Sequence, residues 1–418
     1  MDSGNVAWML TASALVLFMT PGLAFFYGGL VRGKNAISTI MYSFAAMGVV
    51  SVVWVLWGYS LAFGAGGALI GNLDYLGFQG VSADDPDAML FAVFQMMFAI
   101  ITPALITGAF AERFKFTTYL VFLVVWVTLV YAPIAHWVWA ADGWILGIGA
   151  LDFAGGTVVH INAGVAAIAA AYLVGKRRNV DRGVEPHNVP FVVLGAAILW
   201  VGWFGFNAGS GLAADGLAVS AFLVTNTAAA TAMVVWLILG NIHTGKMSAV
   251  GAATGAVAGL VAITPAAGFV GPMGSIAVGV GAGILTFYAV RIRHKFGFDD
   301  ALEVAAVHGL GGVWGAIATG IFAVGGIGLV DGDAALVIDN IIAVGATIGY
   351  SFVVTFVILK ILDVIPGLGL RADETEEDAG LDIALHGERA YVGDGADSVS
   401  YTHLRAHETL RYLVCRLL

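Results

Sequence analysis

The sequence predicts an all-α polytopic membrane protein with eleven transmembrane helices, arranged as two inverted five-helix repeats plus a final long helix. The composition, the number of apolar runs and one repeated pattern predict this architecture. The chain has 418 residues, of which 60% are hydrophobic and only 11% are charged. Soluble domains carry about 25% charged residues, and a chain this apolar cannot hide its hydrophobic surface in one aqueous core. We therefore exclude a soluble globular protein.

Eleven apolar runs follow one another along the chain. A membrane span needs about 20 largely apolar residues. Runs of this kind lie at 6–31, 36–63, 88–111, 116–139, 153–175, 189–207, 217–240, 247–263, 273–290, 302–324 and 336–362. The segment TPAAGFVGP (264–272) separates the eighth run from the ninth, because its two prolines and two glycines interrupt a helix. We expect a transmembrane domain at 1–362, with repeats at about 6–175 and 189–324 and the last helix at about 336–362.

The first run, after MDSGNVAWML, is interpreted as a retained span, because no basic segment of a signal peptide precedes it. Lysine and arginine then occupy the loops after the first, third, fifth, seventh and ninth runs, whereas the other loops contain none. The positive-inside rule places these basic loops in the cytoplasm. We expect a multi-pass protein of the cell (plasma) membrane, with its N-terminus outside and its C-terminus cytoplasmic.

The chain becomes polar after the last run. Residues 363–396 are expected to form a cytoplasmic tail, in which DETEEDAG (373–380) is a solvated acidic segment. Residues 397–418 mix Arg, His and Leu without a convincing period and resemble the translation of a sequencing or assembly artefact. We therefore leave this last segment out of the fold prediction.

An Asp-to-His spacing occurs twice. DFAGGTVVH (152–160) and DALEVAAVH (300–308) both place a histidine eight positions after an aspartate, and both histidines precede a nearby glycine. The two units lie 148 residues and five predicted spans apart, so the second crosses the membrane in the opposite direction. An inverted repeat of this kind often holds a substrate path near the bilayer midplane.

His160 and His308 lie deep inside predicted spans. An ionisable group at that depth is costly, which makes it a functional hypothesis, although a neutral histidine can also simply hold neighbouring helices together. Two histidines at matching positions favour a polar rail through an apolar pore, because a neutral imidazole both donates and accepts hydrogen bonds. We expect Asp152 to cap a helix at the outer mouth and to assist a cation there. Asp300 and Glu303 are its inner counterparts, with a structural role.

Aromatic residues gather at the outer ends of several spans. Phe94 and Phe98 share one helix face, Trp139 ends a span, and WFGFNAGSG (203–211) brings Trp203, Phe206 and Ser210 to another outer end. Spacing alone favours an anchoring belt at the membrane interface. The alternative is a cation–π cage for a small cation, with the serine hydroxyl as an acceptor.

Several stretches resemble the ammonium transporter family (Amt/Mep/Rh), in particular its Amt branch. The resemblance runs from about residue 4 to residue 391. It rests on PGLAFFYGGLVRGKN (21–35), ITPALITGAFAERFKF (101–116), DFAGGTVVHINAG (152–164), GWFGFNAGSG (202–211), ITPAAG (263–268), AAVHGLGGVWG (305–315) and GERAY (387–391). It implies eleven helices and a homotrimer with one pore in each subunit.

The resemblance also implies a site and a mechanism. The twin pore histidines would be His160 and His308. The outer ammonium site would consist of Trp139, Ser210 and Phe98, supported by Asp152, and the gate of Phe98 and Phe206. The apolar lumen would be lined by Leu23, Leu199 and Val304, with Thr264 and Trp203 near the path. Ammonium would be recruited outside and deprotonated, and ammonia would be conducted inward. Potassium would be rejected because it cannot lose a proton.

The resemblance also bears on the partners of the protein. The resemblance implies that a PII-type signalling protein docks on the cytoplasmic face, and the membrane lipid surrounds the spans. A net charge of −10 argues against nucleic acid, and the only cysteine, Cys415, excludes disulfide frameworks and cysteine metal sites. The spans contain no activated nucleophile, so we expect no enzyme activity and no cofactor. The alternatives are an ammonium sensor or an Rh-like gas channel of the same fold, and Trp139 with Ser210 favours the transporter.

Overall fold

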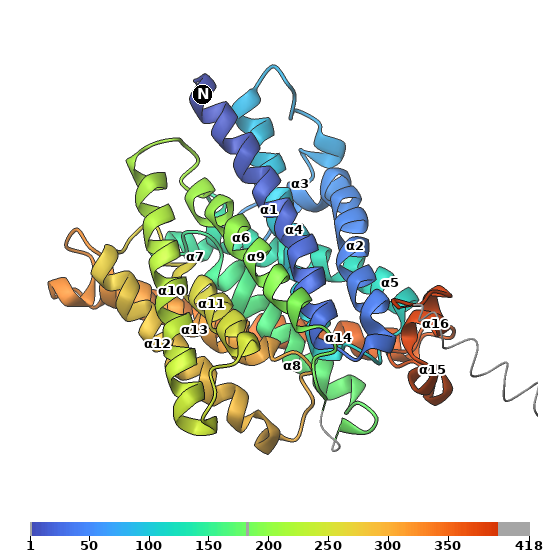
Figure 1. The fold of residues 1–418 in the computed structure, drawn as a ribbon. Helices are drawn as coiled ribbons and strands as arrows, with labels where there is room; N and C mark the ends of the chain where they lie inside the picture. Colours follow the sequence, from blue (N-terminus) through green and yellow to red (C-terminus); the bar gives the residue numbers. More distant parts are fainter. Residues whose placement is uncertain (1, 181–183, 392–418) are drawn as a thin grey trace, which may run out of the picture.

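The computed structural model describes residues 2–180 and 184–391, and these are folded into helices and loops (Figure 1). Ten helical segments are long and apolar enough to cross a membrane, and a shorter apolar helix, α11, occupies the place of the eighth predicted span. The predicted eleven-helix architecture is therefore confirmed. Residues 397–418, which we interpreted as an artefact, lie outside the described part of the chain.

The first five spans are α1 (Ser3–Leu30), α2–η2–α3 (Ala36–Val53, Trp54–Gly58, Tyr59–Phe63), α4 (Pro86–Phe110), α5–η4–α6–α7 (Phe116–Trp126, Val127–Tyr131, Ala132–Trp139, Trp144–Gly147) and η5–α8 (Gly156–Ile161, Asn162–Val174). The next five are α9 (Val189–Gly209), α10 (Gly216–Thr244), α11 (Ala249–Ile263), α12 (Pro272–Ile292) and η8–α13 (Ala305–Leu310, Gly311–Phe322). The final span is α14 (Ala335–Val364), and the tail carries α15 (Glu374–Ala379) and α16 (Leu381–His386). The helix break expected at 264–272 lies between α11 and α12.

Glycines let α1 and α9 pack closely along their length. A Cβ atom on Gly195 would lie 2.2 Å from the backbone nitrogen of Phe26, and one on Gly202 would lie 2.2 Å from the side chain of Met19. No side chain fits in so small a gap. This contact explains part of the high glycine content, because small residues allow membrane helices to approach each other.

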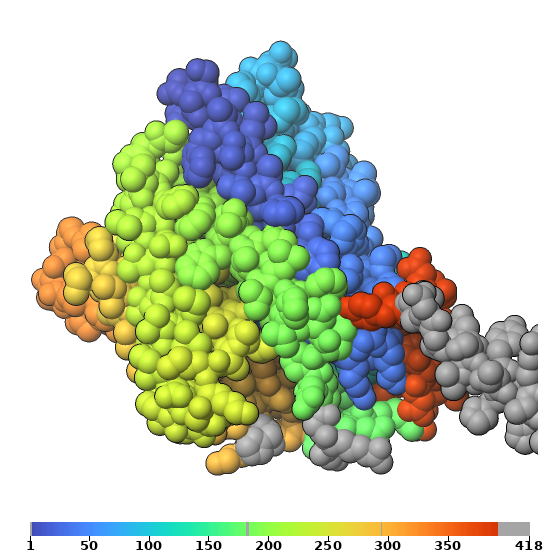
Figure 2. Space-filling view, in the orientation of Figure 1, coloured from blue at the N-terminus to red at the C-terminus, as the bar shows by residue number. Residues whose placement is uncertain are grey.

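The acidic segment of the tail is solvated only in part, because Asp373, Glu374 and Asp378 are exposed whereas Glu377 is buried. Glu377 is buried and accepts hydrogen bonds from the Arg371 guanidinium, with Nε to Oε1 at 2.5 Å. Asp378 pairs with Arg178 at 3.1 Å. The Asp382 carboxylate accepts from two backbone N–H groups at the start of α2, one of them at 2.8 Å. The acidic side chains therefore hold α15 and α16 against the basic loops, where Figure 2 shows the red tail beside the blue and green segments.

Candidate functional site

The DFAGG segment forms the cap of a helix that begins inside the protein. The Asp152 carboxylate accepts hydrogen bonds from the backbone nitrogens of Gly155, Gly156 and Thr157 at 2.6–2.8 Å, and it contacts the Thr157 hydroxyl. These groups begin the π-helical segment η5, which carries His160 in its last turn. Asp152 is therefore a helix cap, as the sequence predicted, although the chain becomes helical only at Gly156. A negative charge at a helix N-terminus is favourable.

The two glycines of this segment are required by geometry. Gly155 has φ 114°, a left-handed backbone conformation that other residues rarely adopt, and a Cβ on Gly156 would lie 2.6 Å from the ring of Pro265. Together they turn the chain sharply beneath the outer surface and start η5 against the α11–α12 loop. This turn sets the depth of His160.

The second unit repeats the arrangement. The Asp300 carboxylate accepts from the backbone nitrogen of Ala305 at 2.7 Å, at the start of the π-helical segment η8, and His308 lies in its last turn. π-Helical turns are rare and frequently occur at functional sites. The two units of the predicted repeat therefore share three features: an aspartate that caps the helix, a π-helical first segment, and a histidine in the last turn of that segment.

A pair of glycines brings the two histidine helices together. A Cβ atom on Gly164 would lie 2.3 Å from the Cα of Gly309, whereas a Cβ on Gly309 would lie 3.5 Å from the Cα of Gly164. The first distance is a severe overlap with backbone, and the second is an ordinary contact. Gly164 is thus the member of the pair that permits the close crossing next to His308.

The two imidazoles lie side by side in the protein interior. Their Nδ1 atoms are 3.2 Å apart, their ring centroids are 5.3 Å apart, and both side chains are almost completely buried. A hydrogen bond between two Nδ1 atoms requires one to donate and the other to accept. If both rings are neutral, one therefore carries its proton on Nδ1 and the other on Nε2. The pair then presents one donor and one acceptor at its two Nε2 atoms.

One of these Nε2 atoms, that of His160, is available for a hydrogen bond with a molecule in the lumen. His160 Nε2 is buried, and no group in the described residues forms a hydrogen bond with it. The ring stacks on Trp203, with centroids 5.3 Å apart, and on Phe206, with centroids 6.0 Å apart. Trp203 is held in turn by Thr264, whose Oγ1 accepts from the indole Nε1 at 2.8 Å. His160 is therefore fixed in orientation with one polar atom unpaired.

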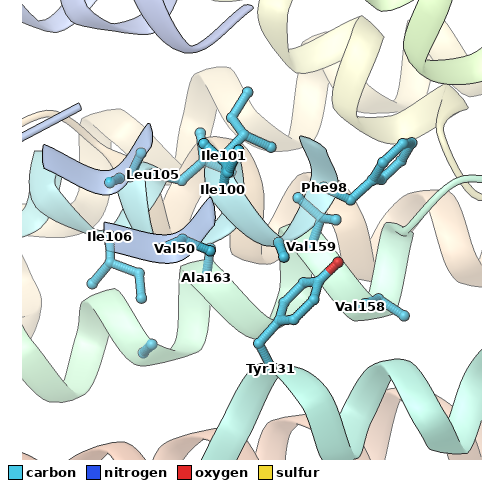
Figure 3. Packing of buried hydrophobic residues seen from close by; sticks show 14 of the residues in the cluster. Val50, Phe98, Ile100, Ile101, Leu105, Ile106, Tyr131, Val158, Val159 and Ala163 are labelled. Atoms are coloured by element: carbon cyan, nitrogen blue, oxygen red, sulfur yellow. The ribbon is translucent and has the colours of Figure 1, made fainter. Parts of the chain in front are cut away.

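The histidines border a narrow apolar lumen. The space open to the centre of a water-sized sphere is about 10 Å³, which is close to the minimum that holds one water molecule. Its wall consists of Met19, Leu23, Phe26, Ile101, Leu105, Val159, His160, Leu199, Trp203, Phe206, Val257 and His308. Figure 3 shows Phe98, Ile101 and Leu105 of α4 packed over Val159 at the start of the η5–α8 span.

Two of the three residues expected to line the lumen are found in its wall. Leu23 and Leu199 line it, but Val304 is not in its described wall. Val304 is fully buried and packs next to Gly108, which is also next to the ring of Tyr27. Apart from Leu23, the lining positions on α1, α4 and α11 carried no sequence signal, because ordinary apolar residues occupy every face of these helices. Only the packing identifies which face borders the lumen.

Two phenylalanine rings meet at the end of the lumen that lies toward Trp139. The centroids of Phe98 and Phe206 are 4.2 Å apart with an interplanar angle of 33°, and both side chains are buried. Trp139 meets Phe98 edge-on, with centroids 5.9 Å apart, and its Nε1 donates to the carbonyl of Asp152 at 2.9 Å. Phe98, Phe206 and Trp203 do not face lipid, so the expectation of an interfacial belt is wrong for these three residues.

Ser210 lies one turn beyond Phe206. It ends α9, is partly exposed, and its hydroxyl donates to the Phe206 carbonyl at 2.8 Å. A hydroxyl oxygen that donates in this way keeps its lone pairs for a further donor. This end of the lumen thus combines the partly exposed Trp139, the Ser210 hydroxyl as an acceptor, and Asp152, whose carboxylate caps η5.

A second cavity, which we call the inner vestibule, lies on the other side of His308. It has a volume of 460 Å³, and His308 lines both this vestibule and the lumen. Its wall includes the polar side chains of Arg177, Ser248, Thr254, Arg293 and Glu303. The path therefore changes from a dry, narrow lumen to a wide polar space at His308.

Several known proteins are similar to this chain in sequence and in fold. The model of the family described as Ammonium Transporter Family matches residues 7–391. The ammonium transporter of Bacillus subtilis is 50% identical over 404 residues, which cover 94% of this chain and 99% of that protein. The crystal structure of Candida albicans Mep2 superposes with a TM-score of 0.86 at 37% identity, covering 90% of this chain and 88% of that one. A structure described as a Sensor Amt Protein superposes with a TM-score of 0.83 at 33% identity, covering 92% and 98%.

Proposed function

This chain belongs to the ammonium transporter family, and from this premise we propose that it moves ammonium across the cell membrane in the form of ammonia. It is a multi-pass membrane transporter or channel, not an enzyme. The observation that carries the proposed mechanism is the histidine pair in an apolar lumen, with its rings 5.3 Å apart and one Nε2 unpaired. Ammonia has three N–H donors and one lone pair, so it can bond to both an acceptor and a donor nitrogen.

The proposed path begins at the outer end. Ammonium is attracted to the rings of Trp139 and Phe98 and donates to the Ser210 hydroxyl, while the Asp152 carboxylate contributes negative charge. A cation over an aromatic ring gains about 0.5–2 kcal/mol, more where water is excluded. Ammonium and potassium are bound comparably by charge, but only ammonium has N–H groups for the hydroxyl.

Deprotonation then provides the selectivity: at the outer end, ammonium gives its proton to a water molecule, which leaves as hydronium, and ammonia remains. A charged side chain at the bilayer centre costs roughly 2.5–3.5 kcal/mol on insertion scales, and a bare cation in the lumen meets a similar obstacle. Ammonia avoids this cost, and it passes between Phe98 and Phe206 when the rings separate. It then follows His160 and His308 to the inner vestibule. Potassium has no proton to lose and stays outside.

Flux measurements in proteoliposomes test this function. We expect the purified protein to conduct ammonium and to exclude potassium, measured as ammonium-driven change of internal pH and as potassium-sensitive dye signal. A sensor of the same fold would bind ammonium without conducting it. Equal conduction of both cations would contradict the deprotonation step.

The substitution Trp139→Leu tests the outer site. We expect ammonium affinity to fall roughly two- to thirtyfold, because a cation–π contact of about 0.5–2 kcal/mol is lost and 1.4 kcal/mol corresponds to a factor of ten. The half-saturating concentration of ammonium flux measures this effect. Trp200→Leu is the control, because it is the same substitution at a tryptophan that is not part of the lumen wall. A folded Trp139→Leu protein with an unchanged saturation curve would restrict Trp139 to a packing role.

Three further expectations remain predictions of the family resemblance. They are the homotrimer, the docking of a PII-type protein on the cytoplasmic face, and the orientation with the N-terminus outside. The docked tail supports the second, because α15 and α16 join the basic loops into one folded layer that a partner could recognise.

A further inference from the structure

Glu303 lies at the inner end of the path in a strained backbone conformation. It directly precedes η8, has φ 64°, and its side chain lines the inner vestibule together with His308. A left-handed conformation is uncommon and strained for a residue with a side chain, and it often occurs at functional sites. Its carbonyl accepts from the backbone nitrogen of Val307 at 2.9 Å, so His308 follows within about one and a half turns.

The carboxylate of Glu303 forms an ion pair with the Arg293 guanidinium. Arg293 Nε lies 2.8 Å from both carboxylate oxygens, and its hydrogen bond goes to Oε1. The buried Oε2 accepts no hydrogen bond from the described residues, so this ion pair leaves lone pairs on Oε2 unused. A carboxylate oxygen with unused lone pairs can accept an N–H group.

Burial and a neighbouring carboxylate raise the pKa of this carboxyl group. Burial and, after it, Asp300 raise the pKa of Glu303 to about 8, and Arg293 and Arg177 oppose that rise. Asp299 lies 3.7 Å from Arg293 and shares its charge. A carboxyl group whose pKa is raised toward neutral pH suits an acid–base role.

Building on the proposed function, we infer that Glu303 is the inner proton-exchange residue of the path, which binds the transported nitrogen after His308 and exchanges a proton with it. For inward transport, ammonia takes the proton of the Glu303 carboxyl group and leaves as ammonium. The carboxylate then takes a proton from hydronium in the vestibule and releases water. For outward transport, the carboxylate accepts a proton from ammonium, ammonia enters the lumen, and the carboxyl group then gives its proton to water in the vestibule, which leaves as hydronium. This assignment replaces the structural role expected from the sequence.

The substitution Glu303→Gln removes the titrating group and keeps the size of the side chain. We expect the ammonium flux to fall about tenfold, less than the roughly 10²–10⁴-fold typical of a general acid or base, because vestibule water can partly substitute. The flux is measured in oriented proteoliposomes in both directions while the pH on the vestibule side is varied. Glu303→Gly, which suits the left-handed backbone, removes the carboxyl group without strain and should give the same loss.

A second glutamate provides the matched control. Glu112 also has a left-handed backbone, with φ 74°, and its buried carboxylate pairs with Arg32, but it is not part of the vestibule wall. We expect Glu112→Gln to conduct with the pH dependence of the wild type. A loss of flux in both variants would indicate that a strained ion pair, not proton exchange, explains the effect, and would overturn the inference.

The direction of the pH effect separates chemistry from packing. As the vestibule pH rises through about 8, the ratio of wild-type to Glu303→Gln flux should rise for outward transport, which needs the carboxylate, and fall for inward transport, which needs the acid. A constant ratio in either direction, with folded Glu303→Gln or Glu303→Gly protein, would overturn the inference. Failure of the wild type itself to conduct ammonium would instead contradict the proposed function.

Discussion

Replacing both His160 and His308 by alanine is expected to admit potassium and to reduce the preference for ammonium by roughly 60- to 300-fold. The estimate follows from the roughly 2.5–3.5 kcal/mol that keeps a charge out of the bilayer centre, at 1.4 kcal/mol per factor of ten. The two rings stack against each other, and His160 also stacks on Trp203, so their removal widens a lumen whose open space of about 10 Å³ is close to the minimum for one water molecule. A wider, wetter lumen lets the hydrated cation pass without losing its proton.

The measurement is ammonium and potassium flux for the wild type, the two single variants and the double variant. An acidic replacement at either position should favour the intact cation still more, because it supplies a counter-charge. His243→Ala is a suitable control, because His243 is exposed and contacts Tyr288 at the end of α10. Suppose all folded variants conduct ammonium and exclude potassium as the wild type does. The histidines would then only hold helices together.

Gly164→Ala is expected to lower ammonium flux by about a hundredfold and to reduce stability. Its Cβ would lie 2.3 Å from backbone atoms of Gly309, and 3.1 Å from the carbonyl carbon of His308. The two helices must separate to accept it, and overpacking of this kind costs typically 1–3 kcal/mol. Because His308 precedes Gly309, the separation moves one ring away from the other. A displacement of about 1 Å can cost about 10²-fold in a positioned site.

The reciprocal substitution is the control for this prediction. In Gly309→Ala the new Cβ would lie 3.5 Å from the Cα of Gly164, an ordinary contact, although both changes add one methyl group to the same crossing. We expect near wild-type flux and a small change in melting temperature. Equal effects of the two substitutions would mean that helix proximity at this crossing does not set the histidine geometry.

The span assignments came directly from the sequence, and their physical basis is simple. A helix needs about 20 apolar residues to cross a bilayer. Lipid offers no hydrogen-bond partners to the backbone, so an apolar run of that length must form a helix whatever its neighbours are. The same holds for the break at 264–272 and for the cap at Asp152, which depend on local residues only. The Asp-to-His spacing also identified the repeat, because eight positions are preserved when a unit is inverted.

Positions that depend on distant partners were harder to predict. Spacing alone suggested a lipid-facing belt for Phe98 and Phe206, yet their rings meet 4.2 Å apart inside the protein. The docking of the acidic tail was not expected either, because its partners Arg178 and Lys34 lie far away in the sequence. Neither contact leaves a local pattern.

The sequence by itself determined how many times the chain crosses the membrane, where the repeat lies, and which histidines lie at its centre. The tertiary structure alone decided which helix faces enclose the lumen, and it decided the 3.2 Å approach of the two imidazoles. It also brought Glu303, for which the sequence suggested only a structural role, to the vestibule wall together with His308. The physical reason is that insertion into lipid depends on local composition, whereas a pore forms between helices that are far apart in the chain. Its geometry is fixed by close backbone approach, as at Gly164, which hydrophobicity does not encode.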